Sequence, residues 1–383
     1  MNTPAQILWE SPSDFPAATH LAIAGDFLPA GRIALPEATG WKEAADALAP
    51  LFEDVSIAFA NLECALDADT LPPRALAGIG DIVSAPSAVL DYLRAIRVPA
   101  GGIANNHIFD FGQAGAARTQ SIISNAGMIP LGLSRGLRHA PQVFVWRGPG
   151  RLRVGFWAAA KATRDPATGK TAGVEPATLQ RARQALAAME LQGANFCVAL
   201  LHAGCLRTHY PDPEDVRLMD SMAGAGFDIV AASHSHRISG GRKISGENRP
   251  PAFCFYGLGS LVSGFTFCPA EREGLVIVLG ISPEGNLARV ELRPVEIAPS
   301  GLGVLPSGER HAAILERFRK LSEEIADGSF ARLFYRDISE GMIPLYWRDA
   351  RAAFHQAGMR GLARKAGRVR LRHVRRLLHK VMG

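Results

Sequence analysis

The stretches NFCVALLHAG at residues 195–204 and FDIVAASHSH at residues 227–236 decide how this chain folds. Each is a run of apolar and β-branched residues that ends in histidine, which is typical of a buried strand in a parallel sheet. His202 ends the first run, and His234 and His236 end the second. Side chains at positions i and i+2 of an extended segment point the same way, so we expect the three imidazoles to meet at one sheet edge. A single buried histidine is more often a hydrogen-bonded core residue, but three together favour a metal site.

Composition excludes several classes of protein. The first 20 residues lack the basic start and apolar segment of a signal peptide, and no apolar run approaches the roughly 18 residues of a membrane-spanning helix. We therefore expect a soluble, cytoplasmic protein. The five cysteines are odd in number and form no C-x-x-C pair, which argues against a disulfide framework or a structural zinc knuckle.

The first half of the chain alternates apolar runs with helical patterns, and several runs end in polar residues. Residues 20–25 are predicted to form a buried strand that stops at Asp26, and residues 55–63 (VSIAFANLE) a second that delivers Asn61 and Glu63. The segment GGIANNHIFDFG then places polar side chains between Asn105 and Asp110. Helices are expected at 42–51, 86–96 and 112–125.

The second half begins with expected strands near 142–147 and 152–158, and helices follow at 176–193 and 213–225. Three further runs, at 253–263, 275–281 and 287–297, are predicted to form consecutive antiparallel strands. This order favours an α/β protein with a mixed sheet, or two packed sheets, flanked by helices.

The polar residues at strand ends form a candidate site, because open α/β sheets place their sites at the carboxyl ends of strands. They are Asp26, Asn61, Glu63, Asn106, His107, His202, His234 and His236. A mixture of carboxylate, amide oxygen and imidazole suits Mn²⁺, Zn²⁺ or Fe²⁺ better than Mg²⁺ or Ca²⁺. One ion, or two bridged by a carboxylate, would make hydroxide available near neutral pH.

A series of short motifs gives the chain a family resemblance over about residues 20–263. They are GD at 25–26, NLE at 61–63, ANNHIFDFG at 104–112, HAG at 202–204, GFDIVAASHSH at 226–236 and YGLGSLV at 256–262. The chain resembles the poly-γ-glutamate capsule biosynthesis (CapA-like) family, which is similar to the calcineurin-like metallophosphoesterases. The resemblance implies a four-layer α/β/β/α sandwich with a metal site between the ends of the two sheets.

The resemblance also implies roles for individual residues. Its metal ligands would be Asp26, Glu63, Asn106, His202, His234 and His236, with Glu63 as the bridge between two ions. His107 would be a proton donor beside them, and Asp110 would orient the loop that carries it.

The chain also departs from the family pattern. Leu28 stands where the wider phosphoesterase pattern has a histidine, so one metal would lack a ligand. The usual H-W-G-x-E-Y motif lacks its tryptophan and glutamate here, where residues 202–207 read HAGCLR. The usual Gly-x-His-Pro-His reads Ala-Ser-His-Ser-His at 232–236, and the usual Ser-Leu-Gly-Asn reads Gly-Leu-Gly-Ser at 257–260. The substrate pocket is therefore expected to differ from that of the family.

The charge of the chain is concentrated at its end. From residue 348 onward there are eleven Lys and Arg against Asp349 alone, a balance of +10 that leaves −4 for residues 1–347. Apolar residues recur at near-helical spacing from Met359, which predicts a basic amphipathic helix at 359–383. An anionic membrane surface is the favoured partner, packing on the protein's own domain is the close alternative, and nucleic acid is the weakest of the three.

These observations predict four segments: a lead-in at 1–19, a CapA-like metallophosphoesterase-type domain at 20–300, a helical extension at 301–358 and the basic helix at 359–383. Three functions remain open. The favoured one is a metal-dependent hydrolase or transferase that supports synthesis of poly-γ-glutamate or another anionic capsule-type polymer. The alternatives are a metallophosphoesterase acting on a phosphate ester, and a non-catalytic accessory subunit of a membrane-bound polymer synthase. The expected location is the cytoplasm, with peripheral attachment to the membrane as the alternative.

Overall fold

The computed structural model of the chain describes residues 6–338, apart from 13–15, 32, 34–39, 74–81, 99, 162, 164, 247–249 and 267. Beyond residue 338 it describes only residues 351, 354–355 and 358–359. The predicted basic helix at 359–383 therefore lies outside the described residues, apart from Met359. Within the described part of the chain, no helix combines the length and the apolar character needed to cross a membrane.

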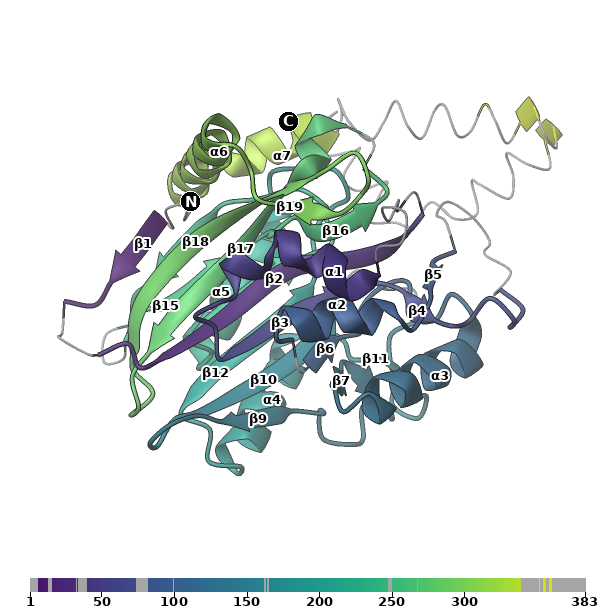
Figure 1. Cartoon of the computed structure of the whole chain (residues 1–383). Helices are drawn as coiled ribbons and strands as arrows, with labels where there is room; N and C mark the ends of the chain where they lie inside the picture. The colour runs from purple at the N-terminus through teal and green to yellow at the C-terminus, as the bar shows by residue number, and fades with distance from the viewer. Residues whose placement is uncertain are drawn as a thin grey trace.

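A nine-stranded sheet is built around the long strand β2 (Thr19–Gly31), whose residues are almost all buried (Figure 1). Its order is β1 (Gln6–Glu10), β18 (Leu287–Ile297), β17 (Glu273–Ile281), β2, β3 (Ile57–Leu62), β6 (Ala100–Gly102) and β7 (Ile129–Leu131). Two more strands join it, β16 (Ser260–Gly264) beside β2 and β19 (Gly303–Val304) beside β18. The strands β2, β3, β6 and β7 are parallel, whereas β1, β17 and β18 are antiparallel to their neighbours. The sheet is therefore mixed.

A six-stranded sheet packs against the first. Its order is β14 (Gly241–Ile244), β15 (Ala252–Phe255), β13 (Ile229–Ser233), β12 (Phe196–His202), β10 (Arg153–Ala160) and β9 (Phe144–Arg147). The four central strands are parallel and the two edge strands are antiparallel to them. Two small ladders complete the strands, β8 (Leu133–Ser134) with β11 (Gly173–Val174) and β4 (Ala65–Leu66) with β5 (Ser84–Ala85).

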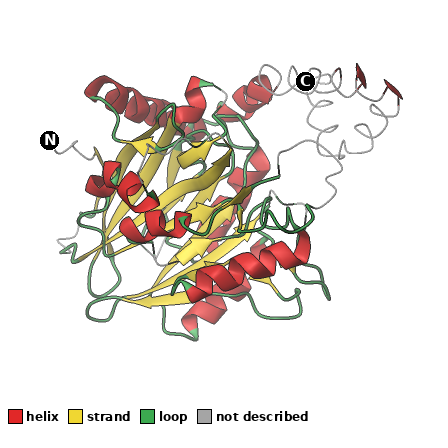
Figure 2. Cartoon of the chain, turned by 45° about the vertical axis from the view of Figure 1, so that its right-hand side comes forward, coloured by secondary structure: helices red, strands yellow, loops and turns green. Residues whose placement is uncertain are grey.

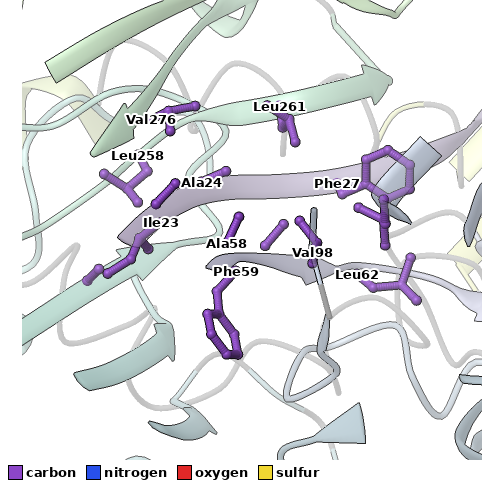
Figure 3. Packing of buried hydrophobic residues seen from close by; sticks show 14 of the residues in the cluster. Ile23, Ala24, Phe27, Ala58, Phe59, Leu62, Val98, Leu258, Leu261 and Val276 are labelled. Carbon is purple, nitrogen blue, oxygen red and sulfur yellow. The ribbon is translucent and has the colours of Figure 1, made fainter. Parts of the chain in front are cut away.

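The core lies mainly between the two sheets. Phe59 of β3 stacks on Phe156 of β10, with ring centroids 3.8 Å apart, and both side chains are fully buried. Figure 3 shows Phe59 among the apolar side chains of the neighbouring strands, including Ile23 and Ala24 of β2. Stacked aromatic pairs contribute about 0.5–1.5 kcal/mol beyond the area that they bury. This contact therefore helps to fix one sheet against the other.

Helices cover the outer faces of both sheets (Figure 2). The first sheet carries α1 (Trp41–Ala44) and α2 (Val89–Ala95), with α3 (Gly112–Asn125) beside β7; the second carries α4 (Leu179–Glu190) and α5 (Pro213–Ala225). Two more helices, α6 (Gly308–Ala326) and α7 (Phe330–Asp337), follow the last strand. Short 3₁₀ turns occur at Ala45–Ala47, Ala49–Leu51 and Pro269–Arg272. The predicted α/β/β/α sandwich with mixed sheets is confirmed.

The prediction of three consecutive antiparallel strands was wrong for the first of them. Residues 253–263 divide into β15, parallel to β13 in the second sheet, and β16, parallel to β2 in the first. The break lies at Gly257–Gly259, where Gly259 has φ +66° and an added Cβ would lie 2.2 Å from the carbonyl oxygen of Glu273. Only β17 and β18 form the expected antiparallel pair. The strand predicted at residues 20–25 does not stop at Asp26 but continues to Gly31 as β2. The strands β1 and β14, and several short strands, were not predicted from the sequence.

Candidate metal centre

The pairing of the strands places the predicted site residues at one end of both sheets. In the second sheet, His202 at the end of β12 lies opposite Ser233 at the end of β13, next to His234. In the first sheet, Asp26 of β2 lies opposite Asn61 of β3. The backbone N–H of His234 donates a hydrogen bond of 2.9 Å to Asp26 Oδ2, which joins the two sheets at this point.

Two groups of potential ligands overlap at this junction. Glu63, His202 and His234 form one group, and Asp26, Glu63 and His236 form the other, with the ligand atoms of each group within 4.8 Å of one another. Glu63 Oε1 is 3.3 Å from His202 Nε2, and Glu63 Oε2 is 4.0 Å from His236 Nε2. Asp26 Oδ2 is 3.4 Å from His236 Nδ1. Both groups share Glu63, the residue predicted to bridge two ions.

The donor atoms fit a cation because several of them are buried without a partner. Neither carboxylate oxygen of Glu63 has a hydrogen bond within the described structure, and His234 Nδ1 has none either. Leaving a buried polar group unpaired costs about 1–3 kcal/mol, and more for a charged group, so such groups are rare in native proteins. Unpaired oxygens and an unpaired imidazole nitrogen around one point are what a divalent ion would satisfy.

The backbone is strained where the chain leaves β13. His234 has φ +126° and His236 has φ +55°, although neither is glycine. Residues held in such conformations cost on the order of 1–3 kcal/mol each and cluster at functional sites. These conformations turn the chain after β13, and both histidines lie beside Glu63.

The charges of the cluster shift the pKa values of its members. Burial would raise the pKa of Asp26, but its contacts with His202 and His236 hold it well below the usual value. Burial would lower the pKa of His202, but the carboxylates of Glu63 and Asp26 raise it to about 9. His236 has a raised pKa, because the same two carboxylates outweigh its burial. The pKa of His234 is lowered well below 6.5 by burial and by the charges of His202 and His236.

Three asparagines hold the cluster together. The side-chain oxygen of Asn106 lies 2.6 Å from His202 Nε2, which brings this predicted ligand to the first group. Asn61 donates a hydrogen bond of 2.7 Å to Asp26 Oδ1 and lies 3.1 Å from His202 Nδ1. Asn105 is fully buried; it donates to the carbonyl oxygen of Leu62 and accepts from the backbone N–H of His107. Asn61 and Asn105 therefore position the ligands.

His107 and Asp110 form a pair at the edge of the cluster. His107 Nδ1 lies 2.7 Å from Asp110 Oδ2, and the same oxygen accepts a 2.9 Å hydrogen bond from the backbone N–H of Val83. An ionised carboxylate only accepts hydrogen bonds, so Asp110 fixes the proton of His107 on Nδ1 when the ring is neutral. Nε2 of His107 then faces Glu63 Oε1 at 4.0 Å. This arrangement suits a group that exchanges a proton with a substrate beside the centre.

All eight predicted site residues lie at this end of the sheets, although their roles remain predictions. Leu28 is buried in the core, and its aliphatic side chain has no atom that could bind a metal ion. Asn61 contacts two predicted ligands, Asp26 and His202, although it is not a predicted ligand itself. Its place at a predicted strand end, two residues before Glu63, was the only sign of this in the sequence. Asn105 gave no such signal, because turn geometry explains an asparagine in that loop equally well.

Comparison with solved structures finds similar arrangements of the chain at low sequence identity. The Haemophilus influenzae NAD nucleotidase aligns with 79% of this chain and 62% of its own, at 14% identity and a TM-score of 0.43. A putative 5'-nucleotidase from Staphylococcus aureus (14% identity, TM-score 0.47) and a 5'-nucleotidase precursor from Thermus thermophilus (14%, 0.45) each align with 79% of this chain and 58% of their own. The chain thus spans about three fifths of the length of these proteins.

A search of curated proteins finds no significant match. The model of the family described as bacterial capsule synthesis protein PGA_cap, in contrast, matches residues 20–264, more than half of the 383-residue chain. The matched region contains every residue of the candidate metal centre, and it agrees with the resemblance that the motifs indicate. The chain therefore belongs to the bacterial capsule synthesis protein family PGA_cap.

Proposed function

We propose that this protein is a metal-dependent hydrolase or transferase that supports the synthesis of an anionic capsule-type polymer such as poly-γ-glutamate. The observation that carries the proposal is Glu63, a fully buried carboxylate whose two oxygens have no hydrogen bond in the described structure and face three imidazoles. Family membership supplies the biosynthetic context. The nitrogen and oxygen donors favour Mn²⁺, Zn²⁺ or Fe²⁺.

The residues of the centre would have two kinds of role, metal binding and proton transfer. Asp26, Glu63, Asn106, His202, His234 and His236 would hold the ion or ions. When bound, a divalent ion lowers the pKa of a coordinated water toward about 7 and polarises the oxygen of a phosphoryl or carbonyl group.

The chain's own proton carrier is His107. Its Nε2 faces the centre while Asp110 binds its Nδ1 at 2.7 Å, so the ring keeps one orientation as it gains or loses a proton. Protonated His107 would donate to the leaving oxygen, and the Asp110 carboxylate would stabilise the positive charge before that transfer.

A cavity whose wall includes one residue of this loop could receive part of a larger substrate. A cavity of about 420 Å³ lies between α3 and the segments around β8 and β11, and Phe109, two residues after His107, forms part of its wall. Small-molecule sites usually measure about 300–1,000 Å³. Among the described residues that line it, Arg135 carries a positive charge and none is acidic, while Gln113, Gln120 and Gln142 supply amides. These groups would suit an anionic, amide-bearing substrate.

Hydrolysis of a phosphate ester is the second candidate. The two ligand groups share Glu63, and a pair of ions bridged about 3.5–4 Å apart is the arrangement that stabilises in-line displacement at phosphorus.

The test is metal content together with activity. Purified protein loaded with Mn²⁺, Zn²⁺ or Fe²⁺ is assayed on γ-glutamyl peptides and on a panel of phosphate esters, and the preferred class decides between the two reactions. His107→Asn should leave metal binding unchanged and lower turnover by about 10²–10⁴, the usual contribution of a general acid. Protein that binds no divalent ion at micromolar concentration, or that binds one and turns over neither class, would instead favour a non-catalytic accessory role.

A further inference from the structure

The helices α6 and α7 lie beyond the region matched by the family model, yet they contact the segments that carry the metal ligands. Helix α6 packs against β14 of the second sheet and β18 of the first, so it closes one side of the sandwich (Figure 1). The amphipathic helix buries His311, Ile314, Phe318, Leu321 and Ile325.

The loop that follows His202 is tied to both helices. Asp337 at the end of α7 accepts a 2.8 Å hydrogen bond from the backbone N–H of His209. Glu324 of α6 accepts a 2.8 Å hydrogen bond from the hydroxyl of Tyr210. An apolar contact supports the same loop, because the buried residues Cys205, Phe334 and Ile338 form one cluster.

The loop that follows His236 is tied to the first loop and to α6. Ser239 donates a 2.6 Å hydrogen bond to the carbonyl oxygen of His209, and His209 Nδ1 lies 3.0 Å from the carbonyl oxygen of Ile238. Further along, the backbone N–H of Gly241 donates a 2.9 Å hydrogen bond to Ser322. The helix approaches so closely that a Cβ on Gly240 would lie 2.4 Å from the backbone nitrogen of Ser322.

We propose that Asp337 and Glu324 are positioning residues of the metal centre, which hold the loop after His202 and, through His209, the loop after His236. This inference rests on the proposed metal-dependent function. His236 itself has a left-handed backbone conformation, and Arg207 in the first loop has another, with φ +61°. Such conformations persist only where the surroundings enforce them. The two helices supply that constraint from outside the family region.

The expected effect follows from how closely ligands must be placed. A ligand set must be held within about 0.5 Å of its working geometry. Removing a group that hydrogen-bonds a metal ligand directly typically costs about 10- to 100-fold in metal affinity, and residues that act through a loop are expected at the lower end of that range. Loss of either carboxylate should therefore weaken binding of the ion without removing any ligand.

The experiment measures Mn²⁺ affinity of the full-length protein by calorimetry and the visible spectrum of the Co²⁺ form. Asp337→Ala and Glu324→Leu should each lower Mn²⁺ affinity about tenfold and change the Co²⁺ spectrum. Asp337→Asn and Glu324→Gln keep an oxygen that accepts the same hydrogen bond, so they should stay within about threefold of wild type. Tyr210→Phe removes only the hydroxyl that bonds Glu324. This variant tests the same hydrogen bond if Asp337→Ala or Glu324→Leu impairs folding.

The matched control is Glu323→Gln, one residue from Glu324, because Glu323 is exposed and pairs with Arg319 on the surface. It should bind Mn²⁺ like wild type. If wild-type protein binds Mn²⁺, and Asp337→Ala, Glu324→Leu and Tyr210→Phe show the same affinity and the same Co²⁺ spectrum, the positioning role is refuted. The proposed function would not be affected by that result. Wild-type protein that binds no Mn²⁺, Zn²⁺ or Fe²⁺ would overturn the proposed function on which it rests.

Discussion

Replacing Glu63 by glutamine removes the charge shared by both candidate ligand groups while it preserves the size of the side chain. Glu63 Oε1 lies 3.3 Å from His202 Nε2 and 4.0 Å from His107 Nε2, so a cation held among these groups would lie no farther than about 4 Å from the carboxylate charge. At an effective dielectric constant of about 20, unit charges about 4 Å apart attract by about 4 kcal/mol. Each 1.4 kcal/mol corresponds to a factor of ten, so we expect Mn²⁺ affinity to fall by at least about a thousandfold.

The same substitution has a second consequence that needs no metal. The pKa of His202 is raised to about 9 against the effect of burial, first by the charge of Glu63. In Glu63→Gln the imidazolium loses this partner, so the pKa of His202 should fall toward its ordinary value. Calorimetry measures the affinity, and the imidazole resonances measure the titration.

A buried carboxylate elsewhere provides the control. Glu175 is paired with Arg181 at 2.6 Å, and Glu175→Gln should change neither Mn²⁺ affinity nor the titration of His202. Our reasoning fails if Glu63→Gln binds Mn²⁺ within tenfold of wild type, or if His202 titrates as before.

Three further predictions concern pH, the core and the tail. Mn²⁺ affinity should rise about tenfold per unit between pH 7 and about 9, because the imidazolium of His202 must lose a proton before it can bind an ion; a flat titration would contradict this. Phe59→Ala should lower the free energy of unfolding by about 3–5 kcal/mol in urea titrations, since it removes the ring stacked on Phe156 between the sheets, and a loss below about 1 kcal/mol would be inconsistent with that role. Deleting residues 359–383 should leave metal binding intact and abolish sedimentation with anionic vesicles at low salt; if the full-length protein does not sediment, or if the truncation unfolds the metal domain, packing on the protein's own domain is the better explanation of the tail.

The strand pattern predicted the sheets and the place of the candidate site for the same physical reason, whereas the four-layer arrangement came from the family resemblance. A strand buried on both faces must be apolar along its length, so polar residues such as Glu63 and His202 appear where it ends; Asp26 is an exception, because it lies within β2. The carboxyl ends of parallel strands meet at one edge, and the pattern that reveals the strands therefore also reveals the site.

What the sequence did not reveal depends on contacts between distant segments. Residues 253–263 look like one strand, but the close approach of Gly259 to Glu273 turns the chain from one sheet into the other. The edge strand β1 has mostly exposed residues and therefore lacks the apolar signal of a buried strand. The bond from His209 to Asp337 joins residues 128 positions apart, and nothing in either local pattern indicates it.

The residues of the centre break the local rules that make the rest of the chain predictable. His234 and His236 have backbone conformations that non-glycine residues avoid, and the buried oxygens of Glu63 have no hydrogen bond within the described residues. A conformation of that kind costs about 1–3 kcal/mol, and an unpaired buried group costs about as much again. Whole domains are stable by only about 5–15 kcal/mol, so the centre needs support from a large core and from the helices behind it. The double sheet and the helical pair α6–α7 supply that support.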